Sequence, residues 1–451
     1  MKWNKAAAGV LAGIMVMGCA VSAEEAEQTG AIVQLVGVTA VAETLEDGQA
    51  VTAVMLEYPS EIQAGAVTVS TYKVPGRSIT KVYVNNTGVK GEAASQGKYV
   101  FVELAVDPTP GVGEGSTLLY ANGENQRLPI DLTIQQTANV TMISGDVVEA
   151  GGFENTAEQN LIADEFLKLT YTNPEDGSEL PYRLYVPEGY EDNGGEEALP
   201  LVVFLHGAGE SGSIEANNEA QLLANASAIE FAREDAQEEH PCFVLAPQSV
   251  SHSWSQNNGT EENPEYGPNQ DGENVKNVID ELITEYNIDT SRIYGTGLSM
   301  GSRGTWALST AYPELYAAQI NIASADTYSA EGLAAISDKP IWALVASDDT
   351  ADRVEGFRNN VADLEEQGAV VERRMEEQGW NGYLRGEESE KLAQEQWDAA
   401  EAAGANVLYT EYIAGTTVPN SHWSWRPSFA NDVIRDWLFS QQQETPYTPA
   451  E

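Results

Sequence analysis

Cysteine is nearly absent from this 451-residue chain, which contains only Cys19 and Cys242. Cys19 lies in an apolar N-terminal segment, and Cys242 begins the apolar run 242–246. We therefore expect no internal disulfide, which excludes the class of small secreted domains that depend on disulfide bridges. Cys242 has the surroundings of a buried strand residue rather than of a nucleophile.

Basic residues are also scarce. The chain has 23 Lys and Arg against 70 Asp and Glu, for a formal net charge of −47. Such a charge repels nucleic acid and anionic lipid, so we expect neither as a partner and expect an uncharged substrate instead. The hydrophobic content of 42% excludes global disorder. The length predicts two domains, because single cores rarely grow beyond about 250 to 300 residues.

Long apolar runs are missing outside the first residues of the chain. Since no other run reaches the roughly 18 to 20 apolar residues that span a bilayer, we expect no transmembrane segment. Residues 1–23 have the pattern of a signal peptide, with Lys2 and Lys5 before the apolar stretch 6–17. The sequence thus predicts a secreted or extracellular protein, with a lipid anchor through Cys19 as the alternative.

Residues 30–145 predict an all-β domain. Apolar residues alternate along short segments, as Val100 and Val102 do within 99–106, and turn residues separate the segments. Strands without helical crossovers favour a β-sandwich. Residues 146–162 are rich in Gly, Glu and Asn without a clear period, which predicts a linker.

Residues 163–445 predict an α/β domain with a doubly wound, mostly parallel sheet. Apolar strands are expected at 201–205, 242–246, 292–296, 318–322, 341–346 and 407–412, with helical segments between them. Residues 371–403 are charged, helix-prone and longer than a crossover requires. They are either a helical insertion that covers the active site as a lid or a solvated surface excursion.

The main chemical signal is the pentapeptide GLSMG at residues 297–301. It directly follows an expected strand and precedes the helical stretch 302–312. A serine on a sharp strand-to-helix turn needs small neighbours two residues away on each side, which Gly297 and Gly301 provide. Ser299 is therefore the candidate nucleophile, and the helix that starts here favours negative charge at the same point.

A histidine must serve as general base for such a serine, and the chain has only four. His206 belongs to a glycine-rich turn, His240 follows an acidic helix, and His252 lies in a polar loop before the serine. His422 alone follows the serine in the chain, between the last strand and the C-terminal helix. It is the candidate base, because this type of fold orders its triad as serine, acid and histidine.

The acid that orients the histidine should follow the strand 341–346, where Asp348, Asp349 and Asp352 occur. The offset from the strand end favours Asp349, with Asp348 as the alternative. The glycine-rich turn 206–210 (HGAGE) follows the strand 201–205. There the backbone N–H of Ala208 is the expected oxyanion donor, and the N–H of Met300 is the second.

With these motifs, residues 182–441 resemble the secreted α/β-hydrolase esterases of the polyhydroxybutyrate-depolymerase-like and feruloyl-esterase-like groups. The motifs are the turn 206–210, APQ at 246–248 with Trp254, the pentapeptide 297–301 and the region of His422. Residues 32–143 are similar to the immunoglobulin-like domain that precedes the catalytic domain in some of these esterases. The resemblance implies ester hydrolysis and places Gln248 and Trp254 near the substrate pocket.

Three departures from these relatives concern the site. Trp423 follows His422 where many relatives have an acid, and Val345 and Ala346 replace a His-Gly pair. The segment 371–403 is longer than usual. The first two loosen the assignment of Asp349, and the third concerns the shape of the pocket.

The sequence thus predicts a secreted serine carboxylesterase that acts on small or carbohydrate-linked esters through an acyl-enzyme. The alternatives are a serine peptidase on the same fold and a binding or adhesion protein with an inactive hydrolase domain. No cofactor is expected, and no metal site, because the four histidines are scattered. The role of the N-terminal domain stays open between spacing, shaping of the pocket, glycan binding and homo-oligomer contact.

Overall fold

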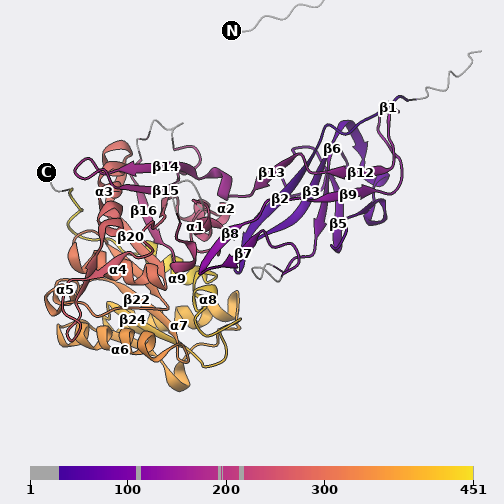
Figure 1. Ribbon diagram of the computed structural model, residues 1–451. Coiled ribbons are helices and arrows are strands. Elements are labelled where there is room, and N and C mark those ends of the chain that lie inside the picture. The colour runs from indigo at the N-terminus through magenta and orange to yellow at the C-terminus, as the bar shows by residue number, and fades with distance from the viewer. Residues whose placement is uncertain (1–29, 108–112, 191–194, 196, 213–217, 450–451) are drawn as a thin grey trace, which may run out of the picture.

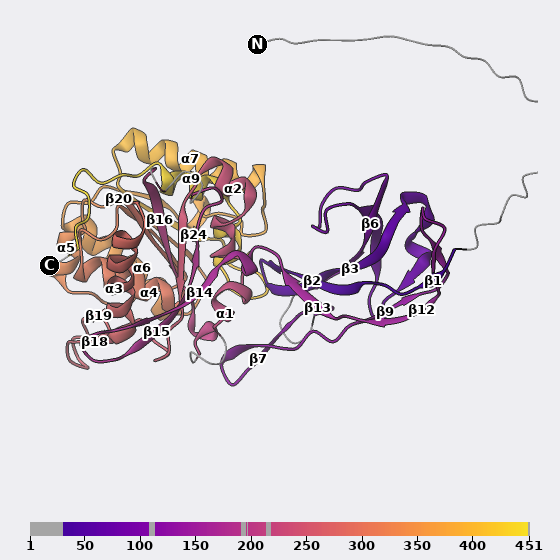
Figure 2. The ribbon, with the colours of Figure 1, turned by 90° about the horizontal axis from the view of Figure 1, so that it is seen from above.

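The computed structural model describes residues 30–107, 113–190, 195, 197–212 and 218–449. The expected signal peptide at 1–23 and the alternative anchor Cys19 lie outside these residues. Figures 1 and 2 show two bodies, an elongated β domain at the N-terminal side and a larger α/β domain, named the catalytic domain below after the sequence prediction. None of the described helices combines the length and apolarity that crossing a membrane requires.

The N-terminal domain consists of strands only, apart from short 3-10 turns, among its described residues. Its strands are β1 (Ile32–Val33), β2 (Gly37–Leu45), β3 (Gly48–Gln63), β4 (Tyr72–Lys73), β5 (Ile79–Asn85), β6 (Gln96–Leu104), β7 (Leu118–Ala121), β8 (Glu124–Arg127), β9 (Thr133–Gln136), β10 (Val140–Thr141), β11 (Val147–Val148), β12 (Gly151–Glu154) and β13 (Ala157–Asn160).

These strands form a sandwich. Within the described residues the larger sheet has the order β13-β2-β3-β6-β5, and the smaller sheets have the orders β12-β9-β4 and β1-β11-β10. Alternating residues of the larger sheet, such as Val54, Leu56 and Val102, pack against Ile134 and Val148 of the smaller sheets. The hairpin β7–β8 leaves the sandwich and reaches the catalytic domain (Figure 1).

The linker predicted at residues 146–162 is not a linker. Strand β11 pairs with β1 and β10, β12 pairs with β9, and β13 pairs in parallel with β2. The segment lacks apolar periodicity because its strands are short and most of their residues are exposed or half-buried. Backbone pairing, rather than side-chain burial, holds them in the sheets.

The catalytic domain alternates strands with helices, as the sequence predicted. Its strands are β14 (Leu167–Thr172), β15 (Glu179–Tyr185), β16 (Leu199–Leu205), β17 (Phe243–Pro247), β18 (Ser255–Asn257), β19 (Tyr266–Pro268), β20 (Ile288–Leu298), β21 (Ala318–Ile322), β22 (Ile341–Ala346), β23 (Val371–Arg374) and β24 (Val407–Tyr412). Its helices are α1 (Ala220–Leu223), α2 (Glu234–Glu239), α3 (Gln270–Glu285), α4 (Met300–Ala311), α5 (Ala330–Ala335), α6 (Ala351–Glu366), α7 (Glu387–Ala403), α8 (Trp425–Phe429) and α9 (Asp432–Phe439).

One large sheet crosses the catalytic domain, with the strand order β14-β15-β17-β16-β20-β21-β22-β24-β23 among the described residues. Strands β16, β17 and β20 to β24 run parallel to one another. Strand β15 is antiparallel to its neighbour β17, and the edge strand β14 is antiparallel to β15. Leu201 and Val203 face α3, whereas Val202 and Phe204 face the side of α1, α7 and α9. Helices thus cover both faces of the sheet, so its strands are apolar throughout.

The segment 371–403 is neither a lid nor a solvated excursion. Its first residues form β23, the parallel edge strand beside β24, and its last form α7, which crosses between the two strands. Ala393 and Ala400 of α7 pack into the main core. Within the described residues, none of the segment lines the pocket at Ser299. The segment therefore supplies an edge strand of the sheet and the helix that connects this strand to β24.

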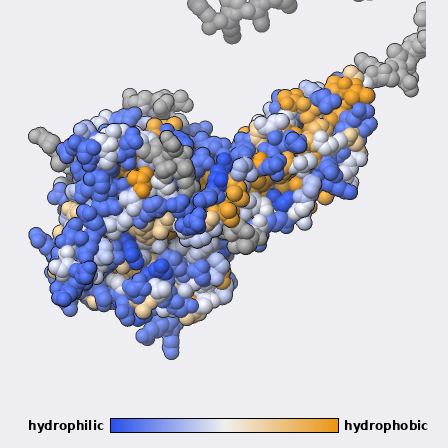
Figure 3. Space-filling model, viewed as in Figure 1, coloured by the Kyte–Doolittle hydropathy of each residue, from blue (hydrophilic) through white to orange (hydrophobic). Residues whose placement is uncertain are grey.

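Hydrophobic residues gather on the visible face of the N-terminal domain in Figure 3, whereas that face of the catalytic domain is mostly hydrophilic. The exposed aliphatic residues of the N-terminal domain include Ile32, Val36, Val69, Val89 and Ile143. Homo-oligomer contact through this domain stays a prediction.

Candidate active site

Ser299 stands on a strained turn between β20 and α4. Its backbone has φ 53° and ψ −117°, an unfavourable conformation for a residue with a side chain. A Cβ atom at Gly297 would lie 2.5 Å from the carbonyl carbon of Gly301, and one at Gly301 would lie 1.8 Å from the backbone oxygen of Leu205. Only glycine therefore fits on either side of the turn that raises Ser299 above the sheet.

The structure brings Ser299, His422 and Asp349 together from the ends of different elements. The Oγ of Ser299 lies 2.8 Å from Nε2 of His422, and Nδ1 of His422 lies 2.7 Å from Oδ2 of Asp349. With Nδ1 protonated, the ring donates to the carboxylate and leaves Nε2 free to accept the serine proton. This is the geometry of a nucleophile, a general base and an orienting acid.

Asp349 rather than Asp348 contacts the histidine. The Asp349 side chain is 2% exposed, and its Oδ1 accepts from the backbone of Thr350 at 2.7 Å and from Arg353 at 2.8 Å. Burial opposes ionisation, but the hydrogen bonds from His422, Arg353 and Thr350 outweigh it and hold the pKa of Asp349 below its usual value. Asp348 is exposed and accepts from the backbone of Gly415 instead. The carboxyl at position 349 is thus kept ionised beside the ring.

Ala208 begins a short 3-10 turn, Ala208–Glu210, directly after β16. It lines the pocket at Ser299, while Met300 begins α4 immediately after Ser299. Neither residue's N–H donates a hydrogen bond within the described part of the chain. The first N–H groups of a helix have no partner inside the helix. Both N–H groups are therefore available to a ligand.

His206 supports this turn from behind. It is fully buried, its Nδ1 lies 2.6 Å from the Gly207 oxygen, and its Nε2 accepts from the backbone N–H of Ser249 at 2.9 Å. Burial lowers the pKa of His206 to about 4, so the ring stays neutral. His252 is exposed and lies 3.6 Å from Glu124. Neither ring contacts the serine.

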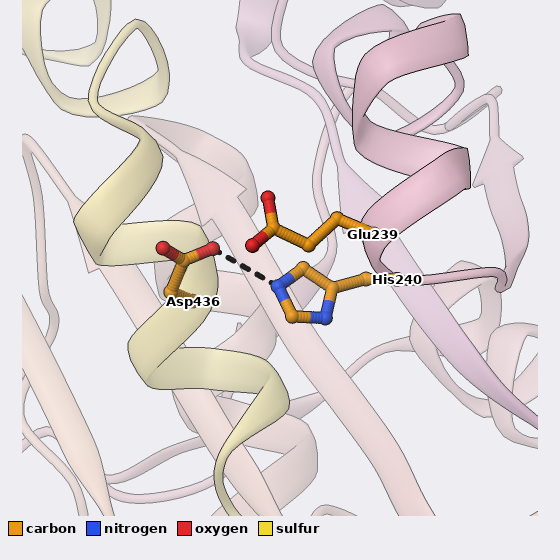
Figure 4. Close-up of side chains that lie close together, drawn as sticks. All are labelled: Glu239, His240 and Asp436. Carbon is orange, nitrogen blue, oxygen red and sulfur yellow. Dashed lines mark hydrogen bonds and ion pairs between the residues drawn. The ribbon is translucent and has the colours of Figure 1, made fainter.

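His240 belongs to a separate cluster with Glu239 and Asp436 (Figure 4), whose potential ligand atoms lie within 4.8 Å of one another. The sequence did not predict this group of potential metal ligands, because Asp436 is distant in the chain. Nε2 of His240 lies 2.9 Å from Oδ1 of Asp436, and its ring stacks on Phe439 at 4.5 Å. These contacts hold the end of α2 against α9, and no residue of the cluster lines the pocket within the described residues.

A pocket of about 510 Å³ opens at Ser299. Aromatic and polar side chains line it together. The lining residues are Tyr120, Asn125, Gly207, Ala208, Gly209, Glu210, Ala224, Asn225, Leu298, Ser299, Arg353, Asn420, His422, Trp423 and Trp425. Tyr120 and Asn125 belong to the hairpin β7–β8, so the N-terminal domain forms part of the pocket wall.

Gln248 and Trp254 do not line this pocket, in contrast to the expectation from the resemblance. Both are completely buried. Nε2 of Gln248 donates to the backbone oxygen of Glu210 at 2.8 Å, and Nε1 of Trp254 donates to that of His206 at 3.0 Å. They hold the 206–210 turn in place from beneath, because buried polar side chains pair with the nearest backbone groups.

Several pocket residues were not found from the sequence. Arg353 lies four residues after Asp349, a spacing that brings a basic side chain back to an acid at the start of a helix, so a signal existed. Tyr120 and Asn125 gave no signal, because they precede the catalytic domain in the chain and reach the site only when the two domains dock.

Ion pairs at the β2–β3 turn form a second contact between the domains. Arg385 donates twice to the carboxylate of Glu46, at 2.9 Å each. Arg426 pairs with Asp47 and also donates to the backbone oxygen of Val418, in the loop that carries His422. The N-terminal domain therefore contacts the histidine loop through Arg426 as well as the 206–210 turn.

Comparisons with known proteins bear on the two domains of this chain. The family model for the esterase Ig-like N-terminal domain matches residues 37–149. A crystal structure described as a thermostable esterase is 35% identical, with a TM-score of 0.75, and the match covers 90% of this chain and all of that one. A feruloyl esterase module from Clostridium thermocellum is 14% identical with a TM-score of 0.39, over 63% of this chain and 91% of the module.

Among curated proteins, poly(3-hydroxyalkanoate) depolymerase C of Paucimonas lemoignei is 29% identical over 154 residues, which are 34% of this chain. The match spans 32% of the depolymerase. The predicted fold class, an α/β-hydrolase domain behind an immunoglobulin-like sandwich, is confirmed by the thermostable esterase and the family model. This chain belongs to the family of esterases that carry an immunoglobulin-like N-terminal domain, and it is a hydrolase of esters.

Proposed function

We propose that this chain is an exported serine carboxylesterase that cleaves its substrate through an acyl-enzyme. The observation that carries this proposal is the position of His422, whose two ring nitrogens lie 2.8 Å from Ser299 and 2.7 Å from Asp349. Such a bridge lets one imidazole take the serine proton while its other nitrogen stays bonded to a carboxylate.

In the first half-reaction, Oγ of Ser299 attacks the ester carbonyl as His422 Nε2 removes its proton. The carbonyl π bond breaks, and its electron pair becomes an oxyanion that accepts from the N–H groups of Ala208 and Met300. When the carbonyl re-forms, the bond to the alcohol breaks, and His422 donates its proton to the leaving oxygen. An ester of Ser299 with the acyl group remains.

In the second half-reaction, His422 removes a proton from water, and the resulting nucleophile attacks the acyl-enzyme. The bond to Oγ of Ser299 breaks, the proton returns to the serine, and the carboxylic acid leaves. The ionised carboxylate of Asp349 holds the ring orientation and stabilises the imidazolium in both steps. Arg353 helps by keeping this carboxylate ionised and in place.

The pocket supports small or carbohydrate-linked esters as substrates. Its wall combines the rings of Tyr120, Trp423 and Trp425 with the amides of Asn225 and Asn420. Aromatic faces pack against apolar groups or sugar rings, and amides bond to hydroxyl groups. The net charge of −47 disfavours polyanionic substrates.

Replacing the nucleophile tests the proposed mechanism. Ser299→Ala should lower turnover of short acyl nitrophenyl esters at least about 10³-fold, because the covalent step is lost. The wild type should gain the mass of one phosphonyl group when treated with a fluorophosphonate, and the variant should not. Circular dichroism should show both proteins equally folded. Retained turnover in the variant, or preference of the wild type for aminoacyl anilides, would refute the assignment.

Export with cleavage after Ala23 completes the proposal. Lys2 and Lys5 followed by the apolar stretch 6–17 support it. The intact mass of the protein recovered from outside the cell should match a chain that begins at Glu24. A lipid-modified N-terminal Cys19 would replace this proposal with that of an anchored enzyme.

A further inference from the structure

Glu210 is a buried carboxyl group beside the proposed oxyanion turn. The residue is 6% exposed and lines the pocket at Ser299 together with Ala208. Within the described residues, no lysine, arginine or histidine forms an ion pair with it, although buried acids are usually paired. The proposed mechanism gives it no part in proton transfer. Its position thus requires another explanation.

The contacts of Glu210 connect the turn to the N-terminal domain. Its Oε1 accepts from Nδ2 of Asn125 at 3.1 Å. Its Oε2 has no hydrogen-bond partner in the described part of the chain and lies beneath the turn, 3.0 Å from where a Cβ of Gly207 would be. The side chain therefore fills the space between the turn and the hairpin β7–β8.

Asn125 has a similarly restricted position. It is 8% exposed on β8, and its Nδ2 would lie 3.0 Å from a Cβ added at Gly209. Gln248 of the catalytic domain holds the backbone oxygen of Glu210 from the other side. The 207–210 turn is thus held between one amide from each domain.

We propose that Glu210 is a positioning residue, which fixes the oxyanion turn by bonding it to Asn125 of the N-terminal hairpin. The proposal rests on the proposed function of the Ala208 N–H as an oxyanion donor. Because Ala208 lies two residues before Glu210 in the same turn, release of the Glu210 side chain would let that N–H move. A displacement of even 1 Å at such a donor weakens transition-state stabilisation.

The protonation state of Glu210 gives this contact a pH dependence. Burial raises the pKa of Glu210 from its ordinary 4.5 to about 7. The fold therefore favours the neutral acid. The stability that the neutral Glu210 side chain contributes to the folded protein is complete below about pH 4.5 and is lost as the pH rises through about 7.

Other titratable groups near the turn are few. The neutral ring of His206 lies behind the turn, and the pair of Glu124 and His252 lies at the hairpin. Tyr120, Arg353 and His422 line the same pocket as Glu210. These groups remain in every Glu210 variant, so any change in pH dependence between variants reports on Glu210.

Kinetics of single and double variants test the link. Glu210→Ala and Asn125→Ala should each lower kcat about tenfold with a smaller change in KM, since each leaves a buried polar group unpaired. The double variant should be no slower than either single variant, because both remove the same bond. Glu210→Gln keeps the shape and an acceptor oxygen and should restore kcat to within about threefold of the wild type at pH 6.

Two further measurements do not depend on catalysis. Amide hydrogen exchange in peptides covering 118–127 and 205–212 should accelerate together in both alanine variants. The melting temperature of Glu210→Gln relative to the wild type should rise as the pH is raised from 5 to 8, because only the wild type must bury a charge. Glu230→Gln is the matched control for kinetics. Burial also raises the pKa of Glu230 to about 7, but this residue does not line the pocket at Ser299. The kcat of Glu230→Gln should therefore equal that of the wild type at each pH.

Wild-type kcat in Glu210→Ala, additive effects in the double variant, or exchange that changes in only one of the two peptides would overturn the proposal. If the wild type has no esterase activity, the proposed function fails on its own. Exchange and melting then still decide whether Glu210 and Asn125 hold the two domains together.

Discussion

The pocket has two walls with different origins. The reactive wall carries Ser299, His422 and Asp349, which all lie on loops or turns after parallel strands of one sheet. The hairpin wall carries Tyr120 and Asn125 from the N-terminal domain. The reactive wall has the geometry of a nucleophile, a general base and an orienting acid, whereas the hairpin wall contributes a phenol and an amide among the described residues. Chemistry therefore belongs to one domain, and part of the pocket shape belongs to the other.

This division predicts different kinetic consequences for the two walls. Changes in the reactive wall should lower kcat, since its groups stabilise charge that develops only during reaction. Loss of the exposed Tyr120 ring in the hairpin wall should mainly raise KM, because this ring contacts bound substrate in the ground state as well. Glu210 would be the point where the two walls are connected.

The largest effect should come from replacing Asp349, the acid of the reactive wall. Asp349→Asn should lower kcat about 10³- to 10⁴-fold, because the amide favours the wrong tautomer of His422. Asp348→Asn is the matched control, since this neighbouring carboxylate accepts, among the described residues, only from the backbone of Gly415. Steady-state kinetics on a short acyl ester would measure both. Similar losses in the two variants would mean that the acid has been assigned to the wrong position.

An intermediate effect should come from the hairpin wall. Tyr120 is 58% exposed and lines the pocket. Leu119, the preceding residue on the same strand, does not line the pocket. Tyr120→Ala should raise KM about threefold to tenfold for esters of bulky alcohols, with little change in kcat, because bound substrate would cover the ring and such an aromatic contact is worth roughly 1 kcal/mol. Leu119→Ala should keep the wild-type KM. An equal rise in KM for both variants would mean that the ring does not contact substrate.

The smallest effect should come from the ion pair at the β2–β3 turn. This pair joins the two domains outside the pocket and helps to hold the hairpin wall in place. Arg385→Ala removes a bidentate, partly exposed pair with Glu46 and should cost about 0.5 to 1 kcal/mol of unfolding free energy. The difference should shrink in about 1 M NaCl, because salt screens exposed charges. Arg373→Ala is the control, since its pair with Glu365 lies within the catalytic domain. Hydrogen exchange of the β2–β3 turn should accelerate only in Arg385→Ala.

The reactive wall could be predicted from sequence because its signals are local. A strand, two glycines around a serine and a helix occupy adjacent positions, and chain order leaves one histidine for the base. The choice of Asp349 over Asp348 was weaker, since both follow the same strand. Their side chains point in different directions, which spacing alone does not determine.

The hairpin wall could not be predicted, because Tyr120 and Asn125 reach Ser299 only through domain docking. The placement of Gln248 and Trp254 in the pocket was wrong for a related reason. Polar and aromatic side chains near a site can face either the substrate or the backbone that supports the site, and these two face the backbone. The linker was predicted wrongly because backbone pairing leaves no periodic pattern in short exposed strands.

The segment that connects the two domains is very short. Leu161 bonds to the backbone of Ala42 and packs against the N-terminal sheet, while Ile162 and Ala163 already pack against the main core of the catalytic domain. A catalytic fragment that starts at residue 146 would carry three strands without their sheets. A fragment that starts at residue 163 would expose the surface around the 207–210 turn that the hairpin β7–β8 covers. If the N-terminal domain were exchanged between related enzymes, the hairpin β7–β8 and the catalytic-domain residues that it contacts would therefore have to be exchanged together.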